Sequence, residues 1–288
     1  MWESCRTCVL EKSLIHYPKD APQDQIDRYK DAVKAIVRDF PDEGSAPELA
    51  WHIKQIRKDV FHLIPADFTD IKKHYNQLLM SFEEKLEQQI REAEDPLYSA
   101  LQYAMTGNYI DFAALENVEE DKLLKLLDEA GSIILDQDAY AHLRANVQGN
   151  GKLVYLTDNC GEIVLDKLLI REMLRINPGL SVTVLVRGSS EGNDATVEDA
   201  VQVGLPSVCR VMGNGAPLDA TVLRYLSEEA RELLHEADFI MAKGQANYES
   251  LHGCGLHIFY LFMCKCNFFT TRFQVPKFSG ILTEERSS

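Results

Sequence analysis

The sequence predicts an α/β protein: a Rossmann-like α/β/α sandwich with a mostly parallel sheet, plus an N-terminal helical domain. Up to about residue 106, apolar residues recur at helical spacing. After about residue 150, short apolar runs rich in β-formers alternate with helical patterns, as in parallel sheets with crossover helices. We therefore expect a helical domain at residues 1–106 and an α/β domain at 107–288.

Four segments of the first part are expected to be helices: 23–40, 45–64, 69–94 and 95–108. Ser45 with Glu48 three residues later predicts a capping box at the start of the second helix. Asp95 followed by a proline predicts the start of the fourth helix, and Gly107 predicts its end. The helical part therefore reads as an amphipathic bundle or cap.

The second part contains four apolar runs that are expected to be strands: KLVYLTD (152–158), LSVTVLVRG (180–188), ADFIMAKGQAN (237–247) and LHIFYLFMCK (256–265). The apolar segment after DNCGE is expected to be a crossover helix. GNDATVEDAVQVG (192–204) reads as a loop and a helix, with a capping signal from Thr196 to Asp199. The order of the strands in the sheet cannot be read from the sequence.

Composition excludes several classes of partner. The chain has 45 acidic and 30 basic residues and a formal charge of −15, which argues against a nucleic-acid groove or an anionic membrane surface. No segment approaches the roughly 20 apolar residues that span a bilayer, and no signal-like apolar run stands at the start. Seven cysteines without a secretory signal favour reduced thiols and a cytoplasmic location.

Polar residues follow each predicted strand. Asp158 and Asn159 follow the first strand, and Arg187 follows the second, ahead of a loop that carries Asn193 and Asp194. Because the carboxyl ends of parallel strands meet at one edge of a sheet, these side chains are expected to converge there. The strands that end near residues 243 and 265 add these further residues: Lys243, Gly244, Asn247 and Lys265.

These residue types point to metal-assisted phosphoryl chemistry. Asp158, Asn159 and Asp194 offer hard oxygen ligands, which suit Mg²⁺ or Mn²⁺. Lysines and helix N-termini nearby can bind phosphate. A divalent ion between carboxylates and phosphate can polarise the phosphoryl group and promote attack by water.

Each residue also has a structural explanation. Asn159 and Glu162 match a helix capping box that needs no ligand. Asp194 can shape a turn, and Lys243 and Lys265 can be solvated strand ends. The joint placement of these residues, more than any one of them, favours a site.

The motifs DNCGE, GNDAT and AKGQANYE, followed by a late Lys-Cys pair, resemble the metal-dependent damage-control phosphatases, a family long known as a domain of unknown function. The resemblance extends to GNYIDF (107–112) and to the opening Cys5-Arg-Thr-Cys8, so it covers nearly the whole chain. The Cys-x-x-Cys start and the Lys-Cys ending resemble the branch found mainly in bacteria and archaea.

The resemblance implies a fold, an activity and site residues. It implies an α/β/α sandwich with a helical domain, and removal of phosphate from small phosphometabolites such as sugar phosphates. Asp158, Asn159 and Asp194 match the metal ligands, with Mn²⁺ or Mg²⁺ expected and Co²⁺ or Ni²⁺ as further options. The segment 243–247 matches the lining of the substrate pocket, and Lys265 matches a lysine that meets the phosphate.

Several further residues have open roles. Cys160 stands where the family more often has a small residue such as alanine, and a thiol beside a metal could be oxidised or could bind soft metals. Asn108 and Asp111 could reach the substrate across the domain junction, or could be turn residues. Cys5 and Cys8 could bind zinc with late ligands from Cys264/Cys266 or from the His252/Cys254/His257 group, or could be unpaired or redox-active thiols.

Other functional classes remain open from the sequence. A nucleotide-dependent transferase, such as a carboxyl methyltransferase, fits the sheet but leaves the Asp-Asn-Asp set unused, and no Gly-x-Gly-x-x-Gly turn follows the first strand. A non-catalytic sensor of a phosphometabolite and a metal is a third class. A haloacid-dehalogenase-type phosphatase would need Asp-x-Asp, whereas Asp158 is followed by Asn159 and Cys160. The oligomeric state is not predicted.

Overall fold

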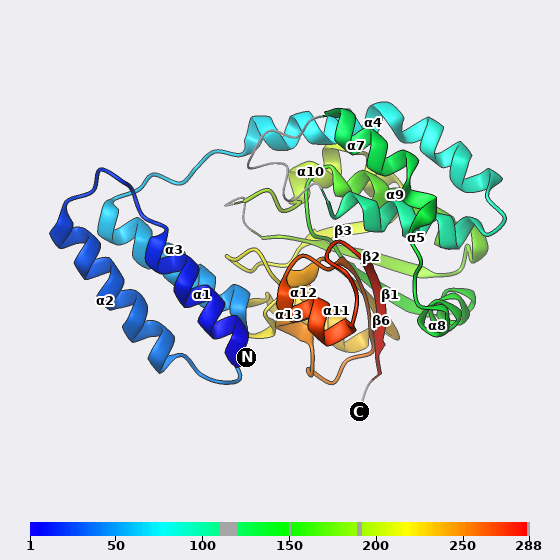
Figure 1. Ribbon diagram of the computed structural model, residues 1–288. Coiled ribbons are helices and arrows are strands. Elements are labelled where there is room, and N and C mark those ends of the chain that lie inside the picture. Colours follow the sequence, from blue (N-terminus) through cyan, green and yellow to red (C-terminus); the bar gives the residue numbers. More distant parts are fainter. Residues whose placement is uncertain (110–119, 150, 189–191, 287–288) are drawn as a thin grey trace.

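The chain folds around one six-stranded sheet (Figure 1). The computed structural model describes residues 1–109, 120–149, 151–188 and 192–286. The strands lie in the order β3-β2-β1-β4-β5-β6; the first five are parallel and β6 is antiparallel to β5. Their bounds are β1 Lys152–Leu156, β2 Ser181–Val186, β3 Arg210–Gly213, β4 Phe239–Lys243, β5 Ile258–Met263 and β6 Gly280–Glu285. The α/β class with a mostly parallel sheet is thus confirmed, whereas β3 and β6 are absent from the sequence prediction.

Helices cover both faces of the sheet. In the N-terminal part they are α1 Glu3–Ile15, α2 Gln23–Asp39, α3 Ala46–Phe61, α4 Thr69–Glu92 and α5 Pro96–Gly107. Before and between the strands they are α7 Glu120–Asp128, α8 Gln137–Gln148, α9 Glu162–Ile176, α10 Val197–Gln202, α11 Glu228–Glu236, α12 Gln245–Leu251 and α13 Asn267–Phe273, with short 3₁₀ turns at Ala130–Ser132, Leu205–Ser207 and Leu223–Tyr225. The four predicted N-terminal helices agree with α2 to α5 to within a few residues.

Side chains that alternate along the strands belong to two separate apolar cores, one on each face of the sheet. On β1, Tyr155 faces the core that includes α4, α5, α8 and α9, whereas Val154 and Leu156 face the core that includes α11, α12 and α13. On β4, Phe239 and Met241 lie on the side of α5 and α9. Because successive side chains on a strand point to opposite faces, a strand buried on both faces reads as the continuous apolar runs seen in the sequence.

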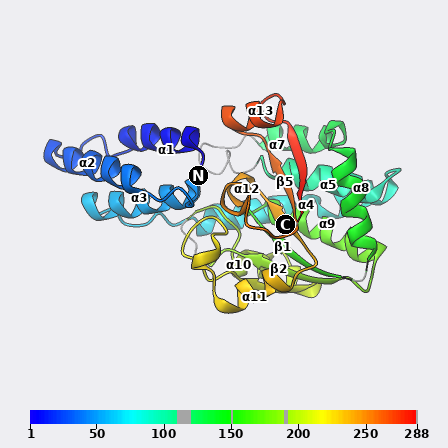
Figure 2. The ribbon, with the colours of Figure 1, turned by 90° about the horizontal axis from the view of Figure 1, so that it is seen from below.

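The N-terminal helices divide into two groups. Helices α1 to α3 form a lobe with its own apolar cluster and extend to one side of the sheet (blue in Figures 1 and 2). Helices α4 and α5 instead pack on α9 and share the core of the α/β part. Trp2 anchors the lobe by stacking on Tyr248 of α12, with ring centroids 6.1 Å apart. The predicted boundary at residues 106/107 falls at the end of α5.

Some of the helix caps predicted from the sequence are present in the structure and one is not. The Asp95 side chain accepts a hydrogen bond from the N–H of Tyr98, and Thr196 with Asp199 forms a reciprocal capping box, as predicted. The capping box predicted at Ser45 is wrong, because Ser45 makes no side-chain cap and the buried Glu48 pairs with Arg224 instead. Among the described residues, no helix is long and apolar enough to cross a membrane.

Candidate active site

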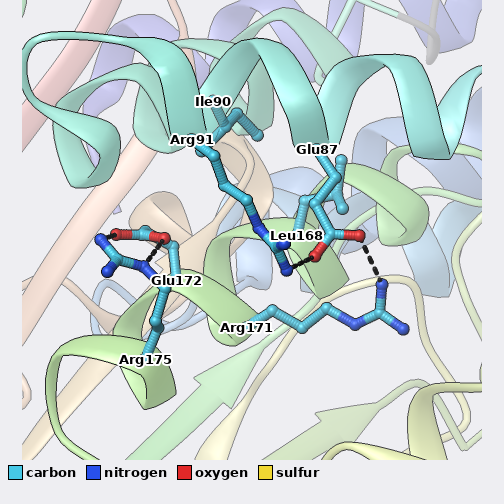
Figure 3. Close-up of a pocket in the computed structure, with 7 residues that line it drawn as sticks. All are labelled: Glu87, Ile90, Arg91, Leu168, Arg171, Glu172 and Arg175. Carbon is cyan, nitrogen blue, oxygen red and sulfur yellow. Dashed lines mark hydrogen bonds and ion pairs between the residues drawn. The ribbon is translucent and has the colours of Figure 1, made fainter.

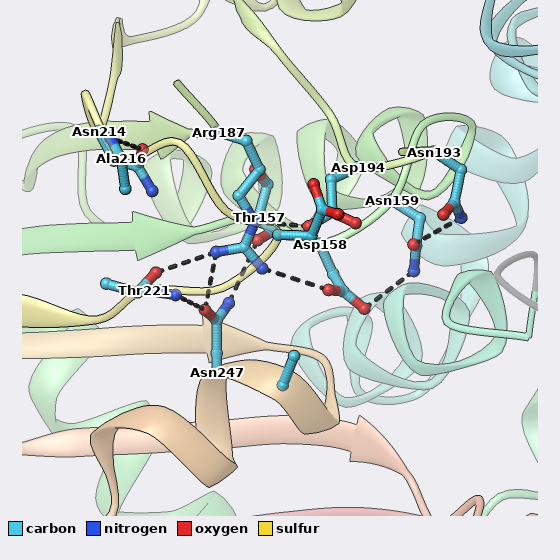
Figure 4. Close-up of polar contacts among 12 residues, drawn as sticks. Thr157, Asp158, Asn159, Arg187, Asn193, Asp194, Asn214, Ala216, Thr221 and Asn247 are labelled. Carbon is cyan, nitrogen blue, oxygen red and sulfur yellow. Dashed lines mark hydrogen bonds and ion pairs between the residues drawn. The ribbon is translucent and has the colours of Figure 1, made fainter. Parts of the chain in front are cut away.

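The carboxyl ends of β1, β2 and β4 bring the predicted site residues together (Figure 4). Asp158 and Asn159 follow β1, Arg187 follows β2, Lys243 ends β4 and Gly244 follows it. The strands β1 and β4 are neighbours at the point where the winding of the chain reverses. Doubly wound sheets bind their ligands at this switch point.

Main-chain pairing joins the two loops that carry the predicted metal ligands. Asn159 and Asp194 form an isolated antiparallel bridge. The N–H of Cys160 donates to the carbonyl oxygen of Asn193 at 2.8 Å. The Asn193 side-chain amide also donates to Oδ1 of Asn159 at 2.8 Å, between residues 34 positions apart in the chain. The relative position of the two loops is therefore fixed by backbone contacts.

Two glycines shape the turns at the strand ends. Gly161 has a φ of 69° before the first residue of α9, and its N–H donates to Oδ1 of Asn76 on α4 at 2.6 Å. Gly244 has a φ of 81°, and a Cβ there would lie 2.1 Å from Oδ2 of Asp158. The absence of a side chain at Gly244 therefore makes the space in which the Asp158 carboxylate sits.

Arg187 holds the two aspartates (Figure 4). Its guanidinium donates to Asp194 at 2.6 Å and to Asp158 at 3.4 Å, and on its other side to Thr221 at 3.0 Å and to Asn247 at 2.9 Å. Burial alone would lower the pKa of Arg187, but the carboxylates of Asp194 and Asp158 outweigh it and raise the pKa. Arg187 is thus a buried clamp between carboxylates.

Asn247 supports this clamp from α12. Its Oδ1 accepts from Arg187, and its Nδ2 donates to the carbonyl oxygens of Thr157 at 3.2 Å and Lys243 at 2.7 Å. The side chain is fully buried. Its polar atoms are therefore engaged within the protein, which differs from the substrate contact expected from the sequence.

Lys243 lies behind the aspartates, and its side chain is 0% exposed. Its ammonium donates to Glu162 at 2.6 Å, to Asp166 at 2.7 Å and to the carbonyl oxygen of Ala104 at 3.0 Å. These three acceptors use its three N–H donors. Lys243 is neither a solvated strand end nor positioned for the phosphate contact predicted from the sequence, because it continues the buried face of Phe239 and Met241 on β4.

Asp166 is the second buried carboxylate that contacts Lys243. It accepts from the hydroxyl of Tyr155 at 2.6 Å as well as from Lys243. Burial raises its pKa to about 6, against the opposing effect of Lys243. Glu162, also 0% exposed, lies between this pair and the aspartates.

Asn108 lies between Glu162 and Asp158 and contacts both. Its Nδ2 donates to Asp158 at 2.8 Å and lies 3.2 Å from Glu162, and its Oδ1 accepts from the N–H of Met263 at 3.0 Å. Asn108 is fully buried, so its contacts are structural and not those of an open substrate pocket. Asp111 lies outside the described residues.

Lys265 lies apart from the buried lysine. It follows β5, is partly exposed, and its backbone N–H donates to Gln245 at 3.3 Å. Because β5 pairs with β4, Lys265 stands at the same edge of the sheet as Gly244.

The charges of the hydrogen-bonded cluster do not balance. Among the described residues it contains four carboxylates and two guanidinium or ammonium groups, while the amides of Asn108, Asn159, Asn193 and Asn247 carry no charge. The carboxylates belong to Asp158, Asp194, Glu162 and Asp166, and the cations to Arg187 and Lys243. Segments 110–119 and 189–191 contain no lysine or arginine. Buried charge without compensation is costly, so the excess of two negative charges fits one divalent cation bound by oxygen ligands.

Two hollows lie near α4. One of about 650 Å³ adjoins the site and is lined by residues including Lys72, Lys73, Arg187, Gly188 and Thr196. The other, of about 460 Å³, lies between α4 and α9, where Arg171 pairs with Glu87 and Arg175 with Glu172 (Figure 3). The second hollow is lined by paired surface charges away from the strand ends, whereas the first shares Arg187 with the cluster of buried charges.

The cysteines lie outside this chemistry. Cys160 is fully buried in the main core, and burial raises the pKa of its thiol well above the ordinary value, which keeps the thiol neutral. In the part of the chain that the structure describes, no three His, Cys, Asp or Glu side chains are grouped to hold a metal ion. The zinc alternative for Cys5 and Cys8 therefore gains no support.

Sequence reasoning missed three residues of the site. Glu162 matched a capping signal, and its backbone contact with Asn159, at 3.3 Å, is present, but its main partners come from other elements. Asp166 interrupts an otherwise apolar helix face, which is a signal that a buried partner exists. Asn76 of α4 gave no signal, because its bond to Gly161 spans 85 positions.

Comparisons with known proteins agree with this architecture. A sequence profile described as "Damage-control phosphatase ARMT1-like domain" matches residues 1–280. A damage-control phosphatase of Archaeoglobus fulgidus is 29% identical over 271 residues, which cover 91% of each chain. The damage-control phosphatase PH1575 of Pyrococcus horikoshii is 34% identical over 185 residues, which cover 62% of this chain and 61% of that one. The crystal structure of PH1575, described as a DUF89 family protein, superposes with a TM-score of 0.79 at 23% identity over 100% of this chain and 99% of that chain.

Proposed function

The chain belongs to the damage-control phosphatase family defined by the ARMT1-like domain, and we propose that it is a metal-dependent phosphatase that hydrolyses small phosphomonoesters such as sugar phosphates. The relatives named as phosphatases favour hydrolysis over the transferase and sensor alternatives. In this reading the protein clears damaged or surplus phosphometabolites in the cytoplasm.

The unbalanced buried cluster is the observation that carries the metal dependence. Asp158, Asn159 and Asp194 would hold the ion, with Mg²⁺ or Mn²⁺ as the first candidates because all three offer oxygen ligands. Co²⁺ and Ni²⁺ are further candidates. When bound, the ion would supply positive charge to the phosphoryl oxygens and so stabilise the transition state.

The residues of the chain would perform the remaining tasks. Arg187 holds Asp158 and Asp194 in place through two charge-assisted contacts. Lys265 would bind the phosphate, because it stands at the same edge of the sheet as the aspartates, whereas the three donors of Lys243 are engaged within the protein. We assign the backbone around Gly244 and the side chain of Asn193 to the approach of the substrate.

Water is the proposed nucleophile. The Asp158 carboxylate accepts from Asn108, Asn159 and Arg187, and a carboxylate with three donors is a weak nucleophile. Water therefore adds to phosphorus, the P–O bond to the alcohol breaks, and the alcohol leaves with a proton.

The test is phosphate release by chelator-stripped protein, with Mg²⁺, Mn²⁺, Co²⁺, Ni²⁺ or no metal added. The substrates are p-nitrophenyl phosphate and a panel of sugar and nucleotide phosphates. We expect metal-dependent release that is lost in Asp158→Ala and in Asp194→Ala. Asp238→Asn is the matched control, because Asp238 contacts Lys152 at the opposite end of β1. Near-wild-type release by Asp194→Ala would overturn the assignment.

A further inference from the structure

Asn159 is held by two carboxylates in a way that fixes the direction of its amide. Its Nδ2 lies 2.8 Å from Oδ2 of Asp158 and 2.9 Å from Oε2 of Glu162. Ionised carboxylates only accept hydrogen bonds. If the amide were turned over, its carbonyl oxygen would face both carboxylates without a donor between them.

The other end of the amide faces the second loop. Oδ1 of Asn159 accepts from Nδ2 of Asn193 at 2.8 Å, beside the backbone bridge to Asp194. The carbonyl oxygen, which is the atom that can ligate a cation, is thus presented on the side of Asp194. The oxygen and nitrogen ends of a side-chain amide have nearly the same size. The hydrogen-bond partners of Asn159 therefore decide which end points toward Asp194.

Glu162 can select the Nδ2 end because it is itself held. Lys243 donates to its Oε1 at 2.6 Å, and Asn108 lies within 3.3 Å of both carboxylate oxygens. A carboxylate that is 0% exposed needs such compensation. Lys243 in turn is shared with Asp166 at 2.7 Å.

We infer that Glu162, held by the buried Lys243, is a positioning residue that orients the Asn159 amide so that its carbonyl oxygen is available to the divalent cation. This inference rests on the proposed function for the identity of the bound ion. It extends that function by giving Lys243, the last residue of β4, a role in metal affinity in place of phosphate binding.

The experiment measures Mn²⁺ binding by calorimetry, independently of turnover. Glu162→Gln keeps the size of the side chain but adds a donor that can face the carbonyl oxygen of Asn159, so we expect its Mn²⁺ Kd to rise about 10- to 100-fold, as for other residues that support metal ligands. Glu172→Gln is the matched control, because Glu172 is also buried on α9 but pairs with Arg175. Its Kd should stay at the wild-type value.

Two further variants separate orientation from stability. Asp166→Asn removes the other partner of Lys243 without touching Asn159, so it should lower the melting temperature but leave the Mn²⁺ Kd unchanged. If Glu162→Gln fails to fold because Lys243 loses a partner, the double variant Glu162→Gln/Lys243→Met removes that charge and should fold with a weakened Kd.

The outcomes distinguish this inference from the proposed function. A Mn²⁺ Kd of the folded Glu162→Gln or double variant equal to the wild-type Kd would overturn the inference while leaving the phosphatase assignment intact. Mn²⁺ binding that depends on Glu162 in a protein that releases no phosphate would support the inference and refute the proposed activity. A wild-type protein that binds no Mn²⁺ would overturn both.

Discussion

Replacing Gly244 by alanine should displace the Asp158 carboxylate. The new Cβ would lie 2.1 Å from Oδ2 and 2.2 Å from Cγ of Asp158. Carbon and oxygen normally approach no closer than roughly 3.3 Å, so the carboxylate must move by about 1 Å. A misplacement of about 1 Å in a catalytic site can cost about 100-fold in rate. We therefore expect Gly244→Ala to lose about two orders of magnitude in kcat/KM.

The same substitution also strains the backbone. Gly244 has φ 81° and ψ 155°, a region that residues with a side chain rarely adopt, at a cost of about 1–3 kcal/mol. Gly253→Ala is a matched control, because Gly253 has a φ of 84° and nothing lies within 4 Å of its added Cβ. It should show the loss of stability without the loss of activity.

The assay compares phosphate release and urea unfolding for both glycine variants. The predicted result is a decrease in unfolding free energy for both, larger for Gly244→Ala because its Cβ also overlaps Asp158, with a loss of kcat/KM and of Mn²⁺ affinity confined to Gly244→Ala. If Gly244→Ala and Gly253→Ala had equal kcat/KM, the argument that the Asp158 carboxylate needs this space would be refuted.

Three other predictions follow from the structure. Mn²⁺ at about 100 times its Kd should raise the free energy of unfolding by about 2.7 kcal/mol in the wild type; urea unfolding of Asp194→Ala should show no such increase. Burial raises the pKa of Glu249 to about 7, so the stability from its protonated form is complete below the ordinary pKa of 4.5 and is lost as the pH rises through about 7. Glu249→Gln should therefore raise the melting temperature more at about pH 8 than at about pH 5, and an equal effect at both would contradict this. Glu48→Gln should lower the free energy of unfolding by about 1–2 kcal/mol in a urea titration, because Glu48 is buried while its partner Arg224 is 46% exposed; an unchanged midpoint would show that the pair contributes nothing.

The sequence was sufficient to predict those features that depend on the spacing of apolar residues and on which residues follow each strand along the chain. The helices near residues 23–108 follow from the spacing of their apolar residues. Asp158, Asn159 and Asp194 come together because parallel strands end at one edge of a sheet. The class of the fold and the position of these residues could therefore be predicted together.

The sequence was insufficient where tertiary partners override a local signal. Ser45 and Glu48 have the spacing of a capping box, but Glu48 pairs with Arg224, which is 176 positions away. The role of Lys243 was misread because its position at the end of a predicted strand suggested a phosphate-binding group at the edge of the sheet. Counting every second residue from Phe239 would have placed it on the buried face, although its partners Glu162 and Asp166 would have remained unknown.

The clamp by Arg187 and the backbone bridge between the two loops have a consequence for metal exchange. Because Asp158 and Asp194 are already gathered by protein groups, little reorganisation is left for the binding step, and such preorganisation limits the cost of binding. Preorganisation does not by itself choose the ion, because the oxygen ligands offered by Asp158, Asn159 and Asp194 suit several divalent ions of similar size. Which ion occupies the site would then be decided by the relative supply of each metal in the cell and by the intrinsic affinity series, so the natural metal would be a property of the host as much as of the chain.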